Sequence, residues 1–440
     1  MSPGDNGSIT VLLLSVYGFV AAAPERRITG GFLQLTSIEK EANVVTSDRL
    51  RVGIVGFGNT AQWYHVPALA RLRDRYEVVA VVDPSPENRR RASEQLELSA
   101  DHVSSDVAAL EDRTDIDVID ICTPPLFRKE IIADAIRRGQ HIVCEKPIAT
   151  TPREAAEIER LVEAGTGIFA MMHNYLHLPQ YAALWDPLRD GLIGDVEFVN
   201  INALGYRDLP GTASYKPAWR RDPSIGGGGI LMDLMHYVYV AERLMGGSIE
   251  RVTASLRARN PSGTVEDLAS CRFDSANASA VINLGWGNGP GGVFVSGSRG
   301  RAVVRYEDAD SQAAVEEVFI VNDSGRRTLT VGDRTSGHEG VFRDVARAIA
   351  EGGDPQAPAS AGVRILEAVI AAYASATMGR SVDLPLETAD PVYQLGVAGL
   401  EQLVVDARSW VARCGLFGVG GHHDAEPEVI THDAKPEVLK

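Results

Sequence analysis

Short apolar runs and longer amphipathic runs alternate along residues 51–172. The apolar runs are rich in Val and Ile, as strands buried on both faces are, and the runs between them have helical spacing. The predicted strands are 52–56, 77–82, 117–122, 141–144 and 168–172, and the predicted helices are 62–74, 86–97, 127–138 and 152–164. This alternation predicts a parallel, doubly wound sheet whose ligand lies outside the carboxyl ends of the strands.

The pattern changes after residue 175, where successive strands joined by short turns replace the alternation. Several of these runs alternate apolar and polar residues, which is typical of antiparallel strands with one wetter face. The predicted strands are 196–204, 265–273, 278–284, 293–297, 301–306, 316–320 and 326–331. Two late helices, 339–351 and 361–377, are expected to return to the first domain. The predicted fold class is α/β, with a second α+β domain built on a large open, mainly antiparallel sheet.

These patterns divide the chain into four parts. They are a leader (1–49), an α/β domain (50–172), an α+β domain (173–386) and a C-terminal extension (387–440). Residues 9–23 are apolar like a signal peptide, but no Lys or Arg precedes them and the run is too short to span a bilayer. We expect a disordered, dispensable or mis-assigned leader, with a docking arm and an export signal as alternatives. The extension predicts an amphipathic helix over 392–413, packed within the chain or against another subunit, and then a disordered tail.

The first predicted strand leads into a Gly-x-Gly-x-x-Ala turn just before a helix. Gly56 can adopt a conformation that a side chain resists, Gly58 leaves room for a pyrophosphate, and small Ala61 lets the helix pack on the strand. The second strand ends at Asp83, about 20 residues further on, where a carboxylate can hold the ribose hydroxyls of NAD. The predicted cofactor-binding residues here are Gly56, Phe57, Gly58, Asn59, Thr60, Ala61 and Asp83. Arginines at 89–91 keep NADP open as the alternative cofactor.

Composition and charge narrow the classes of partner. The 440-residue chain carries a net charge of −16, so neither nucleic acid nor an anionic membrane is an expected partner. The four cysteines show no C-x-x-C spacing, and His422-His423 fits a solvated tail, so we predict no metal site. A reducing cytoplasm fits this cysteine usage best.

Two stretches carry candidate chemistry. Glu145-Lys146-Pro147 closes a predicted strand at the ligand-bearing edge, where the lysine can reach a nicotinamide ring and a substrate oxygen. A surface lysine that caps the strand is the alternative. Gly226–Gly229 precede a predicted helix on which Asp233 and His236 lie about 60° apart. These two side chains can serve as substrate anchor and proton shuttle, or they form a polar stripe toward solvent.

In this order, the motifs resemble those of the Gfo/Idh/MocA family of NAD(P)-dependent oxidoreductases, over about residues 50–386. The motifs are Gly56-Phe57-Gly58, Thr123-Pro124-Pro125, Glu145-Lys146-Pro147, Trp219-Arg220 ahead of Gly227–Asp233, and Leu384-Pro385-Leu386. The resemblance implies a Rossmann domain that binds the dinucleotide. Residues at strand ends would also touch this cofactor, namely Thr123, Pro124, Glu145 and Lys146. It further implies an open sheet that covers the active site, and we expect a homo-oligomer, a dimer or tetramer, formed through that sheet.

The resemblance also implies roles at the site. Lys146 would lie nearest the reacting carbon, Asp233 and His236 would face the substrate, and we expect Asn174 and Arg220 to join the pocket. Family members commonly place the histidine four residues after the aspartate, whereas here it is three, so His236 either shares proton transfer with Lys146 or positions the substrate. The expected reaction moves a hydride between nicotinamide and a hydroxyl or ketone carbon of a sugar, sugar derivative or cyclitol. The alternatives are a cofactor-retaining oxidation–elimination or epimerisation enzyme and a non-catalytic dinucleotide-sensing regulator.

Overall fold

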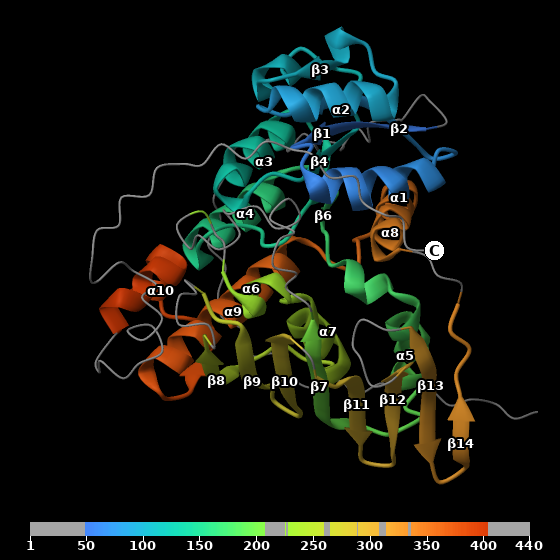
Figure 1. The fold of residues 1–440 in the computed structure, drawn as a ribbon, viewed down its shortest axis with the longest axis vertical. Coiled ribbons are helices and arrows are strands. Elements are labelled where there is room, and N and C mark those ends of the chain that lie inside the picture. The colour runs from blue at the N-terminus through green and yellow to red at the C-terminus, as the bar shows by residue number, and fades with distance from the viewer. Residues whose placement is uncertain are drawn as a thin grey trace, which may run out of the picture. The chain divides into compact units, whose positions relative to one another are not determined.

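The first sheet of the protein is parallel and doubly wound. The computed structural model describes residues 49–206, 225, 228–258, 265–287, 289–307, 314–332 and 336–403. Within them the strand order of this sheet is β3-β2-β1-β4-β5-β6 (Figure 1). The strands are β1 (Leu50–Val55), β2 (Tyr76–Val82), β3 (Val103–Ser104), β4 (Val118–Ile121), β5 (His141–Cys144) and β6 (Phe169–Met171). The helices between them are α1 (Val66–Arg71), α2 (Pro86–Leu96), α3 (Arg128–Arg137) and α4 (Pro152–Ala164). The predicted Rossmann-type alternation is confirmed, and the short β3 was not predicted.

Local capping explains where two of these helices begin. Ser85 Oγ accepts a hydrogen bond from the Asn88 amide (3.4 Å), and Thr151 Oγ1 accepts one from the Glu154 amide (3.0 Å). Each cap is followed by proline at the first helical position, where its missing N–H costs nothing. These signals made α2 and α4 predictable almost to the residue.

The helix predicted over 62–74 is wrong in detail. Residues Ala61–His65 form a π-helical turn, and the α-helix that follows ends at Arg71. A π-helical turn is wider than an α-helical one and is common at functional sites. Here it coincides with burial of the His65 ring, which bonds to Asp120 on β4.

The second sheet is large, mixed and mostly antiparallel, as predicted. Its order in the described residues is β14-β13-β12-β11-β7-β10-β9-β8-β15, and its parallel pair is β7 with β10. The strands are β7 (Val196–Tyr206), β8 (Arg251–Arg257), β9 (Leu268–Asp274), β10 (Ser279–Trp286), β11 (Gly291–Gly297), β12 (Gly300–Tyr306), β13 (Val315–Asn322), β14 (Gly325–Thr328) and β15 (Val382–Asp383). The prediction missed β8, β15 and helix α5 (Pro179–Arg189).

Helices pack on this sheet and join it to the first one. Helices α6 (Ile230–Asp233) and α7 (His236–Met245) contact β10, and α9 (Ala359–Met378) contacts both β8 and α4 (Figure 1). Helix α8 (Gly337–Glu351) contacts α1, and Phe342 O accepts a hydrogen bond from Tyr76 Oη (2.7 Å). The two late helices therefore do return to the first domain. Helix α9 is apolar and long enough to cross a membrane, but 72% of its most apolar stretch is buried inside the protein.

The C-terminal extension departs from the predicted helix over 392–413. The described part has α10 (Pro391–Leu395) and then a 3-10 helix, Gly396–Leu403. The break falls at Gly396, whose φ of +60° is unfavourable for side chains and whose added Cβ would lie 2.4 Å from Thr150 O. Val392, Val397 and Leu400 are buried in the chain's own core. The leader to residue 48 and the tail from 404 lie outside the described residues.

Candidate active site

The turn after β1 has the geometry that a pyrophosphate requires. Gly56 has a φ of +92°, and a Cβ there would lie 2.9 Å from backbone atoms of Cys122 and Thr123, so only glycine fits. A Cβ at Gly58 would meet nothing within 4 Å, which leaves open space beside the turn. The Phe57 amide donates to Asp83 Oδ2 (2.6 Å) and ties this turn to the end of β2.

Asp83 is buried at the end of β2, where the ribose was expected. Its other oxygen accepts hydrogen bonds from the Ser85 amide (2.8 Å) and Asn88 Nδ2 (3.1 Å). A carboxylate has about four acceptor positions, so protein donors hold it in place without using all of them. Arg89 turns back and donates to Asp83 O (2.8 Å), whereas Arg90 and Arg91 pair with Glu87 on the surface of α2.

The ends of β4 and β5 lie side by side beyond this turn. Thr123 Oγ1 is buried and has no hydrogen-bond partner in the described part of the chain. Arg128 donates to Thr123 O through Nε (3.0 Å) and to Glu145 O and Pro147 O through Nη1. Sequence reasoning missed Arg128. The available signal was an arginine at the start of the helix predicted over 127–138, soon after a strand end.

Lys146 links the end of β5 to helix α6. Its Nζ donates to the backbone carbonyl of Asp233 (2.7 Å), and its amide donates to Glu145 Oε2 (2.9 Å). The peptide bond to Pro147 is cis. Burial opposes ionisation of Glu145, but a hydrogen bond from His65 and the charges of His65 and Lys146 hold its pKa below the usual range.

Asp233 and His236 do not share one helix, so that part of the prediction is wrong. Asp233 ends α6 and His236 begins α7. The physical reason is that the Tyr237 amide donates to Leu234 O (3.0 Å), and the carbonyl of Asp233 accepts from Lys146 instead. The three-residue spacing between Asp233 and His236 therefore spans a break between two helices.

The tautomer of His236 follows from its partners. Tyr239 Oη accepts from the Tyr175 amide (3.0 Å) and donates its hydrogen to Asn174 Oδ1 (3.2 Å). His236 Nδ1 lies 2.7 Å from Tyr239 Oη. Because the Tyr239 hydroxyl hydrogen is already donated to Asn174, His236 Nδ1 must be the donor in this contact. Nε2 is then left with the lone pair. Burial, and secondarily the charge of Lys146, lowers the pKa of His236 well below its usual value, which keeps the ring neutral.

Other predicted residues fall at the same place. Asn174 is buried, and the ring of neighbouring His173 stacks on Tyr239 with centroids 4.1 Å apart. His173 Nε2 has no hydrogen-bond partner among the described residues, and burial lowers its pKa to about 3. Arg220 lies outside the described residues. Sequence reasoning missed Tyr239, His65 and His338, and the signal for Tyr239 was its position three residues after His236.

These features fit a bound NAD. The turn at Gly56 has no room for a Cβ, the space at Gly58 is open, and the buried hydroxyl of Thr123 lacks a partner among the described residues. Asp83 ends the second strand beside them. They define a dinucleotide-binding domain whose ligand edge faces a lysine, a neutral histidine and an aspartate.

Comparison with known proteins gives the family. The sequence model of a family described as "Oxidoreductase family, NAD-binding Rossmann fold" matches residues 50–173, and that of the "GFO/IDH/MocA C-terminal domain" matches residues 181–303. Together they span more than half of the chain, which belongs to this family. The chain therefore belongs to a family of NAD-binding oxidoreductases.

Individual relatives are distant. The chain is 28% identical to 2,7-anhydro-N-acetylneuraminate hydratase of Mediterraneibacter gnavus (66% of this chain, 78% of that protein). It is 25% identical to levoglucosan dehydrogenase of Pseudarthrobacter phenanthrenivorans (59% and 63%), and 22% identical to scyllo-inositol 2-dehydrogenase (NADP+) of Bacillus subtilis (77% and 96%). The crystal structure of aldose-aldose oxidoreductase from Caulobacter crescentus has a TM-score of 0.67 at 22% identity, covering 76% of this chain and all of that one. This structural likeness shows a shared fold.

Proposed function

We propose that the chain oxidises or reduces one carbon of a sugar, sugar derivative or cyclitol, with Lys146, His236 and Asp233 at the reacting group. The contact of Lys146 Nζ with Asp233 O (2.7 Å) carries the proposal. It joins the end of β5 in the dinucleotide-binding domain to the segment that bears the other two groups. The levoglucosan and scyllo-inositol dehydrogenases among the relatives support the substrate class.

The residues divide the acid–base work. NAD, when bound, supplies the hydride acceptor. In oxidation, the lone pair on His236 Nε2 accepts the hydroxyl proton, and Lys146 holds the developing carbonyl oxygen and shares the proton. Asp233 orients a neighbouring hydroxyl. In reduction the same groups return the proton.

A second candidate is a reaction in which the cofactor stays bound and is reoxidised within one turnover. The similarity to 2,7-anhydro-N-acetylneuraminate hydratase favours it, because hydration is not a net oxidation. The same acid–base groups then support elimination or epimerisation of a transiently oxidised sugar. Net NADH formation distinguishes the two candidates.

We further propose a homo-oligomer formed through the second sheet and a cytoplasmic location. Phe198 on β7 and Phe294 on β11 are 39% and 45% exposed, and the strand register puts them on one face of the sheet. Exposed apolar residues gathered on a sheet face are typical of subunit contacts. The free thiols of Cys122, Cys144 and Cys271 fit a reducing compartment.

The test measures nicotinamide absorbance with a panel of cyclitols, free sugars and nucleotide-activated sugars. Lys146→Ala should lose about 10²–10⁴-fold in turnover, while NAD affinity changes little because phosphates and ribose bind elsewhere. Lys129→Ala is the matched control, since Lys129 pairs with Glu157 on the helices outside the site. Near-normal turnover of Lys146→Ala would contradict the proposed chemistry and would indicate that this lysine only caps the strand.

A further inference from the structure

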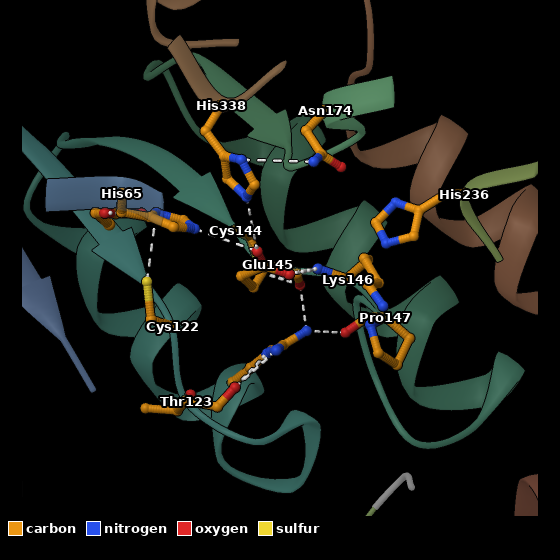
Figure 2. Close-up of polar contacts among 12 residues, drawn as sticks. His65, Cys122, Thr123, Cys144, Glu145, Lys146, Pro147, Asn174, His236 and His338 are labelled. Atoms are coloured by element: carbon orange, nitrogen blue, oxygen red, sulfur yellow. Dashed lines mark hydrogen bonds and ion pairs between the residues drawn. The ribbon is translucent and has the colours of Figure 1, made fainter. Parts of the chain in front are cut away.

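A histidine buried beneath the site lies between two carboxylates. His65 is fully buried. Its Nδ1 lies 2.9 Å from Asp120 Oδ2, and its Nε2 lies 3.2 Å from Glu145 Oε1 (Figure 2). No motif of the sequence singled out His65, and the proposed chemistry does not use this histidine.

Hydrogen-bond accounting limits the charge states that this ring can have. An ionised carboxylate only accepts hydrogen bonds, so with one at each nitrogen both ring nitrogens must donate. His65 is then an imidazolium whose charge balances one of the two carboxylates. The competing arrangement has a neutral ring and a proton on Asp120 or Glu145. That arrangement has the same net charge, so the groups around the ring decide between the two.

The surrounding groups favour the imidazolium. Burial is the largest single influence on the pKa of His65 and lowers it, but the charge and hydrogen bond of Asp120, together with the contact to Cys122, outweigh burial and raise this pKa well above the usual value. Burial raises the pKa of the Cys122 thiol, which faces Nδ1 at 3.4 Å, to about 12, so this thiol stays neutral. From α8, His338 faces Glu145 at 3.9 Å and stays neutral because burial lowers its pKa to about 3.

The contact between His65 and Glu145 extends to Lys146, the proposed reacting lysine. One oxygen of Glu145 meets His65, and the other accepts the amide of Lys146 (2.9 Å). Both oxygens are thus held, and the backbone from which the lysine extends is held with them. We propose that His65, oriented by Asp120, is a positioning residue that fixes Glu145 and through it the backbone of Lys146. The positioning role rests on the proposed function, whereas the charge of His65 does not.

The charge is tested without any activity measurement. In the full chain labelled with ¹⁵N-histidine, one imidazolium signal should persist at pH 8 and disappear in His65→Gln. His141→Gln is the matched control, because His141 lies on β5 of the same sheet and its Nδ1 accepts a hydrogen bond from the Ile168 amide (2.9 Å). If every ring is neutral at pH 8, the inference fails. It also fails if the purified protein holds a stoichiometric divalent metal that His65→Gln loses.

The positioning role is tested by kinetics. His65→Gln leaves two buried carboxylates without their cation, which raises one carboxyl pKa toward neutrality. We expect kcat to fall about 10–100-fold, as for other orienting partners, with an added loss as pH is lowered through that pKa and with unchanged NAD affinity. Asp120→Asn, a second variant, should give the same kcat loss.

The outcomes separate the two proposals. A kcat and pH profile equal to that of His141→Gln would refute the positioning role. A wild-type protein that turns over no polyol but keeps the pH 8 signal would refute the proposed function and leave the charge of His65 standing.

Discussion

Glu266 is a buried acid whose ionisation should lower the stability of the fold. It is 1% exposed, and its Oε1 accepts hydrogen bonds from the Leu231 amide (3.0 Å) and Tyr373 Oη (2.8 Å). Its backbone oxygen accepts the Ile230 amide (3.0 Å). The carboxyl group therefore supports the start of α6, the helix that ends at Asp233. Burial raises the pKa of Glu266 to about 7.

The sign and size of the effect follow from this pKa. The folded protein holds the proton on Glu266 more tightly than the unfolded chain, whose ordinary value is 4.5. The resulting stabilisation is complete below pH 4.5, declines as pH rises, and is lost above about pH 7. The difference between 4.5 and about 7 corresponds to about 3 kcal/mol.

Glu266→Gln isolates this effect, because it keeps the volume and the accepting oxygen but cannot ionise. We expect the variant to match the wild type at pH 4.5 and to exceed its free energy of unfolding by up to about 3 kcal/mol at pH 8. Urea unfolding followed by circular dichroism across this range measures the difference. Glu130→Gln, at an exposed glutamate, is the control. Parallel curves for wild type and Glu266→Gln would refute the reasoning.

Three further changes test the geometry of the site. Tyr239→Phe should lower kcat about 10–100-fold without changing NAD affinity, because His236 Nδ1 loses its partner; an unchanged kcat would contradict the assigned tautomer. Gly56→Ala should weaken NAD binding and stability more than Gly352→Ala, since both have positive φ but a Cβ meets backbone only at Gly56; equal losses in a denaturation assay would contradict this. Asp83 should make NADH bind more tightly than NADPH by calorimetry, and the opposite order would overturn that expectation.

The sequence was most informative where the structure depends on short stretches of chain. Val- and Ile-rich runs predicted the parallel strands, and residues at their ends, such as Asp83 and Lys146, lie at the ligand edge as expected. The break between Asp233 and His236 was not predictable from the local pattern, because apolar residues continue through it at helical spacing. A carbonyl taken by Lys146 ends α6, and that partner comes from 87 positions earlier in the chain.

The buried charges were missed for the same reason. His65 finds Asp120 and Glu145 at separations of 55 and 80 residues. Each residue by itself resembles an ordinary polar position in a helix or strand. What gives them a role is their meeting in a dry site, where two carboxylates and one imidazole must share protons.

A line of polar contacts runs from the end of β5 to helix α7. Glu145 faces His338, whose Nδ1 lies 3.5 Å from the amide nitrogen of Asn174. Asn174 accepts from Tyr239, which in turn accepts from His236. In this line, the acceptor available to each group decides which hydrogen it donates. The lone pair on His236 Nε2 therefore requires segments from both domains to be in place. Acid–base competence is thus a property of the completed fold, and for that reason strand-end residues could be predicted from sequence while their protonation states could not.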